Sequence, residues 1–107
     1  MTFNDNLTIK NRIELLERSI LVNSYAYYEL DTNILSDYQY DQNTQLLAEF
    51  KQNYPEEFEK SRYYKYFKNF ESGTGTGYYL ISMLDSNRTL REKIKRDAYV
   101  ASKLKGE

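Results

Sequence analysis

The sequence predicts an all-α protein in which an antiparallel helical hairpin packs with two or three additional helices. Apolar residues recur at intervals of three, four and seven along most of the chain, which is the spacing of an amphipathic helix. Two segments, Ser36-x-x-Gln39 and Thr89-x-x-Glu92, match the capping box with which many helices begin. Because no segment alternates apolar and polar residues as a half-buried strand does, we expect no sheet.

The first helix is expected from about Ile9 to Leu30. Thr8 is a candidate N-cap, because its hydroxyl can accept a hydrogen bond from a free backbone N–H of the first turn. The helix should end near residues 31–33, where short polar side chains offer the backbone competing hydrogen bonds. The apolar positions of this helix are Ile9, Ile13, Leu16, Ile20 and Tyr27, and Asn23 interrupts them.

The second helix is expected to begin after Ser36 and to end at Tyr54, because Pro55 disfavours helical dihedrals at the residue before it. Its apolar stripe consists of Tyr40, Leu47, Phe50 and Tyr54. The connector between the two helices, residues 31–35, is short, so they should form an antiparallel hairpin.

A third helix is expected over Glu56–Phe70, with its aromatic side chains directed inward. These side chains are Phe58, Tyr63, Phe67 and Phe70. The segment Ser72-Gly-Thr-Gly-Thr-Gly77 is read as a flexible Gly/Thr loop, because no strand precedes it as the established phosphate-binding motifs require.

The run Tyr78–Leu84 is short enough to be a strand or a helical turn, and we assign it to a helix because nothing else in the chain resembles a strand. The last helix should begin at Thr89 and end near Leu104, within a basic C-terminal segment over 88–107. Its apolar side consists of Leu90, Ile94, Ala98 and Ala101.

Length and composition predict one domain over 1–107. The chain has no cysteine and no histidine, so disulfides and the commonest zinc ligands are excluded and no metal site is expected. The N-terminus has no secretory pattern, and no apolar run approaches the ~20 residues of a membrane span. We therefore expect a cytoplasmic protein that does not enter membranes.

Charge is distributed unevenly along the chain. Residues 1–87 carry 8 basic and 13 acidic side chains, a net charge of −5, whereas residues 88–107 carry 7 and 3, a net charge of +4. A basic terminal segment is either a polyanion-binding tail or the solvated face of a helix. Because the acidic remainder opposes phosphate contact, no nucleic-acid binding is expected at physiological ionic strength. The basic residues are Arg88, Arg91, Lys93, Lys95, Arg96, Lys103 and Lys105.

The hairpin contains the most specific motif of the chain. It reads Tyr25-Ala-Tyr-Tyr-Glu-Leu-Asp31, then Ser36-Asp-Tyr-Gln-Tyr-Asp41, and closes on Tyr54-Pro-Glu56. Over residues 25–56 this pattern resembles the N-terminal helical domain of bacterial NAD-dependent DNA ligases, which holds the nicotinamide mononucleotide (NMN) half of NAD. The resemblance implies a ligase-like domain. The Lys-x-Asp-Gly motif and the cysteine cluster of the complete ligases are absent from this sequence.

Five residues of the motif are candidates for binding a nucleotide. Asp37, Tyr40 and Asp41 share one face of the second helix, and Tyr27 and Tyr28 lie near the end of the first helix. Aromatic faces attract a pyridinium ring, and carboxylates accept hydrogen bonds from ribose hydroxyls or a carboxamide. The resemblance implies that the matching ligase positions contact NMN. A purely structural interpretation is also open, with Asp37 favouring the helix start, Tyr40 in the core and Asp41 on the surface.

The functional prediction is a non-catalytic, ligase-like accessory domain that binds NMN or NAD and is encoded by a phage or a mobile element. The alternative is a protein-interaction module that keeps the hairpin as a scaffold and inhibits a host enzyme. The host enzyme would be the host ligase, an NAD-consuming defence enzyme or a CRISPR nuclease, which would make the protein similar to an anti-CRISPR. The partner and the oligomeric state are not predicted.

Overall fold

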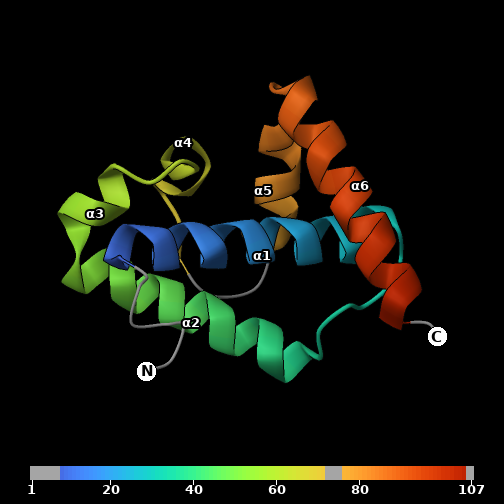
Figure 1. Ribbon diagram of the computed structural model, residues 1–107, viewed down its shortest axis with the longest axis horizontal. Helices are drawn as coiled ribbons and strands as arrows, with labels where there is room; N and C mark the ends of the chain where they lie inside the picture. The colour runs from blue at the N-terminus through green and yellow to red at the C-terminus, as the bar shows by residue number, and fades with distance from the viewer. Residues whose placement is uncertain (1–7, 72–75, 106–107) are drawn as a thin grey trace.

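The computed structural model describes residues 8–71 and 76–105, which form six helices and no strand. The all-α prediction is confirmed. α1 crosses the middle of the molecule, α2 runs antiparallel beneath it, and α5 and α6 cover its other side (Figure 1). The helices are α1 (Ile9–Glu29), α2 (Asp37–Asn53), α3 (Pro55–Glu59), α4 (Tyr64–Phe67), α5 (Thr76–Leu84) and α6 (Arg88–Lys105).

The two helices of the predicted hairpin begin at the expected caps. The Thr8 hydroxyl accepts a hydrogen bond from the Asn11 backbone N–H at 3.1 Å. The Ser36 hydroxyl accepts one from the Gln39 N–H at 3.1 Å, and the Gln39 side chain accepts one in return from the Ser36 N–H at 3.3 Å. This reciprocal pair satisfies two backbone donors that the helix itself leaves free, so the capping box is confirmed.

Asn23 anchors the connector between α1 and α2. Its amide nitrogen donates to the Ser19 carbonyl at 2.7 Å, and its amide oxygen accepts from the Leu35 N–H at 3.2 Å. Asp31 adopts a positive φ of 53°, a conformation that short polar side chains tolerate. Asn23 thus interrupts the apolar stripe of α1 because it holds the chain where it turns toward α2.

The predicted helix over Glu56–Phe70 is wrong in its continuity, because the structure has two short helices, α3 and α4, with a turn between them. Two side chains of α1 stabilise this turn. The Ser61 hydroxyl lies 2.9 Å from a carboxyl oxygen of Glu17, and the Arg62 N–H donates to Glu14 at 2.8 Å. The turn still directs the predicted aromatic residues inward. Phe58, Tyr63, Phe67 and Phe70 are all buried.

The segment 78–84 is helical, as predicted, and lies in α5. The predicted Gly/Thr loop falls on residues 72–77, of which 72–75 lie outside the described residues, while Thr76 and Gly77 belong to α5. The last helix begins earlier than expected, because Asn87 rather than Thr89 caps it. The Asn87 side-chain oxygen accepts from the Leu90 N–H at 3.1 Å, and its nitrogen donates to the Tyr66 hydroxyl at 2.8 Å.

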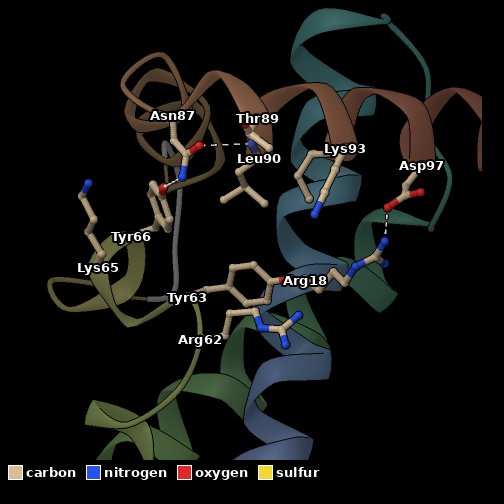
Figure 2. Close-up of a pocket in the computed structure, with 11 residues that line it drawn as sticks. Arg18, Arg62, Tyr63, Lys65, Tyr66, Asn87, Thr89, Leu90, Lys93 and Asp97 are labelled. Carbon is tan, nitrogen blue, oxygen red and sulfur yellow. Dashed lines mark hydrogen bonds and ion pairs between the residues drawn. The ribbon is translucent and has the colours of Figure 1, made fainter.

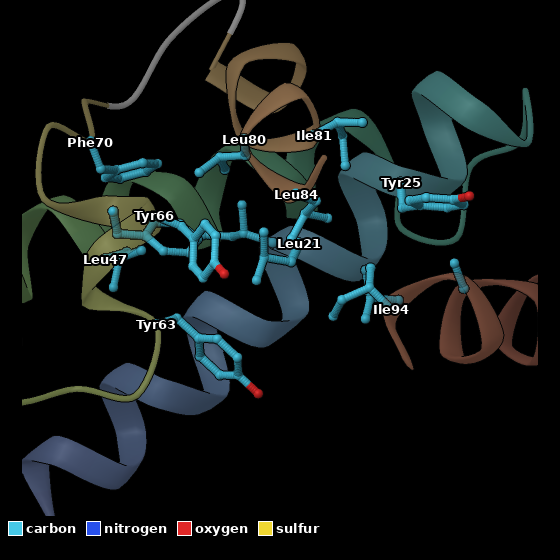
Figure 3. Close-up of a cluster of buried hydrophobic side chains, with 14 of the residues drawn as sticks. Leu21, Tyr25, Leu47, Tyr63, Tyr66, Phe70, Leu80, Ile81, Leu84 and Ile94 are labelled. Atoms are coloured by element: carbon cyan, nitrogen blue, oxygen red, sulfur yellow. The ribbon is translucent and has the colours of Figure 1, made fainter. Parts of the chain in front are cut away.

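The core lies between α1 and the helices around it. Ile20 and Leu21 of α1 are fully buried, as are Leu47 of α2 and Leu84 of α5. Figure 3 shows side chains from several helices directed into this one cluster. Two predicted members of the apolar stripes, Tyr27 and Tyr54, are instead 54% and 40% exposed, because each lies near a helix end, beyond the packed faces. None of the helices within the described residues is long and apolar enough to cross a membrane.

Candidate functional site

The five candidate residues lie at the turn of the hairpin. Tyr27 and Tyr28 lie in the last turn of α1, and Asp37, Tyr40 and Asp41 lie in the first two turns of α2. The connector between the two helices is short, and α1 and α2 pack against each other, so these helix ends lie close together. Their role as ligand contacts stays a prediction, and their geometry decides what they can do.

Tyr40 is the most buried of the five. Its hydroxyl lies 2.7 Å from the Ser24 hydroxyl of α1, and either group can be the donor. Burial raises the pKa of Tyr40, and the hydrogen bond from Ser24 acts in the opposite direction. This contact ties α2 to α1 directly beneath the candidate site. Tyr40 therefore holds the two helices together at the candidate site.

The tyrosine rings form a chain on the surface. The centroids of Tyr27 and Tyr28 are 4.9 Å apart with the rings at 89°, an edge-to-face arrangement that aromatic pairs favour. Tyr28 meets Tyr78 of α5 in the same manner, at 5.8 Å and 75°. All three rings are substantially exposed, from 41% for Tyr28 to 66% for Tyr78. We call Tyr27, Tyr28, Tyr40 and Tyr78 the tyrosine cluster.

Asp37 and Asp41 are exposed in the first two turns of α2, on the same helical face as Tyr40. Within the described residues neither side chain forms a hydrogen bond or an ion pair. Their oxygens are therefore available to accept hydrogen bonds from a ligand. Asp41 also lies close enough to Tyr40 to contribute, together with Tyr28, to the raised pKa of that phenol.

α5 adds two features that the sequence interpretation missed. Gly77 packs so closely on the tyrosine cluster that a Cβ there would lie 2.8 Å from Tyr28 Cε2 and 2.9 Å from both the Ser24 and Tyr40 hydroxyl oxygens. Only glycine fits at this distance without displacing a neighbour. Tyr78 follows it and supplies the third exposed ring. No local pattern reveals this contact, since it joins segments that are far apart in the sequence.

The arrangement suits a flat, cationic, hydroxyl-bearing ligand. Exposed aromatic rings offer their electron-rich faces to a positively charged ring, and the two neighbouring carboxylates can accept hydrogen bonds from hydroxyl or amide groups. In the described part of the chain no group of three or more acidic, histidine or cysteine side chains could hold a metal ion.

Comparison with known proteins places the hairpin in a family. The family model of the DNA ligase-like, N-terminal NAD+-binding domain matches residues 6–61. The chain belongs to this family. A curated relative, the DNA ligase of Pseudothermotoga lettingae, is 46% identical over 48 residues, which are 45% of this chain and 7% of the ligase. No solved structure matches significantly.

The resemblance read from the motifs is thereby confirmed. All five candidate residues of this DNA ligase-like chain lie inside the matched range, whereas Gly77 and Tyr78 lie outside it. The chain spans only a small fraction of the length of the curated ligase that it matches.

Proposed function

We propose that this domain binds the NMN half of NAD, or free NMN, at the tyrosine cluster. The strongest support is that exposed tyrosine rings and two exposed carboxylates lie at the same hairpin turn. Within the described residues these carboxylates form no hydrogen bond or ion pair. The family to which the chain belongs is named for NAD+ binding, and its model covers these residues.

In the proposed complex each group of the ligand has a complementary group in the protein. The pyridinium ring lies against Tyr27 or Tyr28, where the ring quadrupole attracts positive charge. Asp37 and Asp41 accept hydrogen bonds from the ribose hydroxyls or the carboxamide. Tyr40 holds the two helices at the spacing that this requires, through its hydrogen bond to Ser24.

The proposal assigns binding to this domain and no catalysis. Joining DNA ends through an NAD-derived adenylate requires a lysine nucleophile in a nucleotidyltransferase core, and these 107 residues contain no Lys-x-Asp-Gly motif. We further propose that the domain is a cytoplasmic accessory protein encoded by a phage or a mobile element.

Calorimetric titration of the purified domain with NMN, NAD and AMP tests the proposal. NMN and NAD should bind and AMP should not, because AMP lacks the pyridinium ring. At ten times its dissociation constant the ligand should raise the free energy of unfolding by about 1.4 kcal/mol. Absence of NMN binding at millimolar concentration would refute the proposal.

Matched variants locate the site. Tyr27→Ala and Asp41→Asn should each weaken NMN binding with little loss of stability, because both side chains are exposed. Tyr99→Ala removes a similarly exposed ring from α6, at 53% exposure, and should leave NMN binding unchanged. Equal loss from Tyr99→Ala would place binding elsewhere.

One observation favours the alternative of a protein-interaction module that inhibits a host enzyme. Tyr99, Val100 and Leu104 are 53%, 50% and 70% exposed along the last turns of α6, outside the family match. Tyrosine is enriched at protein interfaces, and exposed apolar side chains that lie together can mark an interaction site. The candidate partners are a host ligase, an NAD-consuming defence enzyme and a CRISPR nuclease. Saturable one-to-one binding to one of these enzymes, abolished by Leu104→Asp, is the expected result.

A further inference from the structure

A second concave site lies away from the tyrosine cluster. A cleft of about 560 Å³ opens between α1, the segment 62–66 and the first turns of α6 (Figure 2). None of the five candidate nucleotide-binding residues lines it. Its charged lining is predominantly basic, with Arg18 from α1, Arg62 and Lys65 from the α3–α4 region, and Lys93 from α6. We call it the cationic cleft.

Most of these cations lack a carboxylate partner. Arg18 forms an ion pair with Asp97 of α6. Within residues 8–71 and 76–105, the side chains of Arg62, Lys65 and Lys93 form no salt bridge. Figure 2 shows Arg62 and Lys93 directed toward the space around the Tyr63 ring, from opposite sides of the cleft. Like charges facing one another across a cleft repel, and an anion between them relieves that repulsion.

The floor of the cleft consists of two buried tyrosine side chains. Tyr63 and Tyr66 are only 7% and 5% exposed, and the Tyr66 hydroxyl accepts a hydrogen bond from Asn87 at 2.8 Å. Asn87 also caps α6, so the N-terminal end of that helix, which carries partial positive charge, borders the same space. Because these floor residues are buried and hydrogen-bonded, a ligand can bind without first ordering them.

Nearby acidic groups offset this charge only in part. Glu14 lies at the edge, where its carboxylate accepts a hydrogen bond from the Arg62 backbone N–H at 2.8 Å. Glu17 is fully buried near the Tyr63 backbone, and burial raises its pKa to about 8, so near neutral pH its carboxyl is mostly uncharged. The lining of the cleft therefore holds four cations and one carboxylate, Asp97, with Glu14 at its edge. Lys65 lies at the rim, with its ammonium 5.8 Å from the centre of the Tyr66 ring.

We propose that the cationic cleft binds a small polyanion with adjacent phosphate groups, of which pyrophosphate is the simplest. Guanidinium and ammonium groups are the side chains suited to phosphate oxygens. The volume of the cleft accommodates such a molecule, and Arg62 and Lys93 can reach it from opposite sides, with Arg18 and Lys65 at its border. This proposal is independent of nucleotide binding at the tyrosine cluster.

The distribution of charge on α6 favours a small anion over a nucleic acid. Arg91 is engaged with Glu29 at 3.1 Å, and Lys95 and Arg96 border a different groove beside Leu30. The basic residues of α6 thus surround the helix instead of forming the continuous stripe that tracks a nucleic-acid backbone. Only Lys93 among them lines the cleft.

Titration of the full chain with inorganic pyrophosphate at low ionic strength tests the proposal. Calorimetry measures affinity, and amide chemical shifts locate the site. One saturable site is expected, with shifts concentrated at Arg62, Tyr63, Leu90 and Lys93. Lys93→Glu should weaken binding about tenfold or more, because it replaces an attractive charge with a repulsive one. Lys95→Glu is the matched control, since it makes the same change of net charge two residues away on the same helix and should have less than about a twofold effect. Both residues are exposed, so circular dichroism should show both variants folded.

Three results would overturn the proposal. The first is no pyrophosphate binding by the wild-type chain. The second is equal weakening by Lys93→Glu and Lys95→Glu, which indicates attraction to net charge alone. The third is tighter binding to a duplex DNA oligonucleotide than to pyrophosphate, with both variants affecting it equally, which would assign the basic surface to nucleic acid.

Discussion

The buried carboxyl group of Glu17 predicts an unusual pH dependence of stability. The residue is fully buried within α1, and its Oε1 atom accepts no hydrogen bond from the described residues. Burial raises its pKa from 4.5 to about 8, with Glu14 adding to the rise and hydrogen bonds from Ser61 and the Tyr63 backbone opposing it. The Ser61 hydroxyl is 2.9 Å from Glu17 and 2.8 Å from the Phe58 carbonyl, and its single proton can serve only one of them. A protonated Glu17 resolves this conflict by donating to Ser61 while Ser61 donates to Phe58.

The sign and size of the effect follow from this pKa. A group whose pKa is higher in the folded than in the unfolded state binds more protons when folded, so its contribution is fully present below pH 4.5 and is lost as the pH rises toward 8. At about 1.4 kcal/mol per pKa unit, the loss is on the order of 5 kcal/mol. That is comparable to the whole stability of a marginal domain, roughly 5–15 kcal/mol.

Glu17→Gln isolates this contribution, because glutamine has nearly the same shape as the protonated acid and does not titrate. We expect the variant and the wild type to have similar melting temperatures near pH 5. Near pH 9 the variant should melt higher by at least about 10 °C. Thermal melts followed by circular dichroism across this range measure the difference. Glu49→Gln, an exposed substitution on α2, controls for the loss of one negative charge.

A constant difference between Glu17→Gln and the wild type at all pH values would refute the reasoning. It would mean that the carboxyl group titrates identically in the folded and unfolded chains. Destabilisation by Glu17→Gln at high pH would show instead that the ionised carboxylate is stabilised in the fold.

Three further substitutions test the packing. Gly77→Ala should destabilise the domain by about 1–3 kcal/mol by forcing α5 away from the tyrosine cluster, and unchanged thermal melts would contradict the close approach. Leu21→Ala should cost about 2–5 kcal/mol in denaturant unfolding, whereas Leu15→Ala, at a position 56% exposed, should cost far less. Asn87→Ala should lower the free energy of unfolding by about 1–2 kcal/mol, because it removes the N-cap of α6. A larger loss from Thr89→Ala would show that Thr89 caps the helix, as the sequence predicts.

Local signals predicted most of the helices correctly. The caps at Thr8 and Ser36 and the stop before Pro55 are all decided by residues within a few positions of one another. Spacing also identified Ile94 and Ala98 as the buried side of α6. These features could be read from the sequence because helix termini and amphipathic faces depend on short-range geometry.

Contacts between residues far apart in the sequence explain where the structure differs from the sequence prediction. The break between α3 and α4 depends on Glu14 and Glu17 of α1, which bind the turn at residues 61 and 62 from more than 40 positions away. At the candidate site, the motif places Tyr27, Tyr28, Asp37, Tyr40 and Asp41 at the hairpin turn, but it contains nothing about α5. The packing of Gly77 and the third ring, Tyr78, emerges only from the tertiary fold.

The part of the chain that matches the family is shorter than the part that packs around α1. The family match covers α1, α2 and α3, yet Leu21 and Ala26 of α1 are fully buried in a structure where α5 and α6 cover the other side of that helix. A fragment cut after residue 61 would retain every motif of the family and expose that apolar side to water. It should therefore aggregate or remain unfolded, because the lost burial removes the main force that stabilises so short a chain.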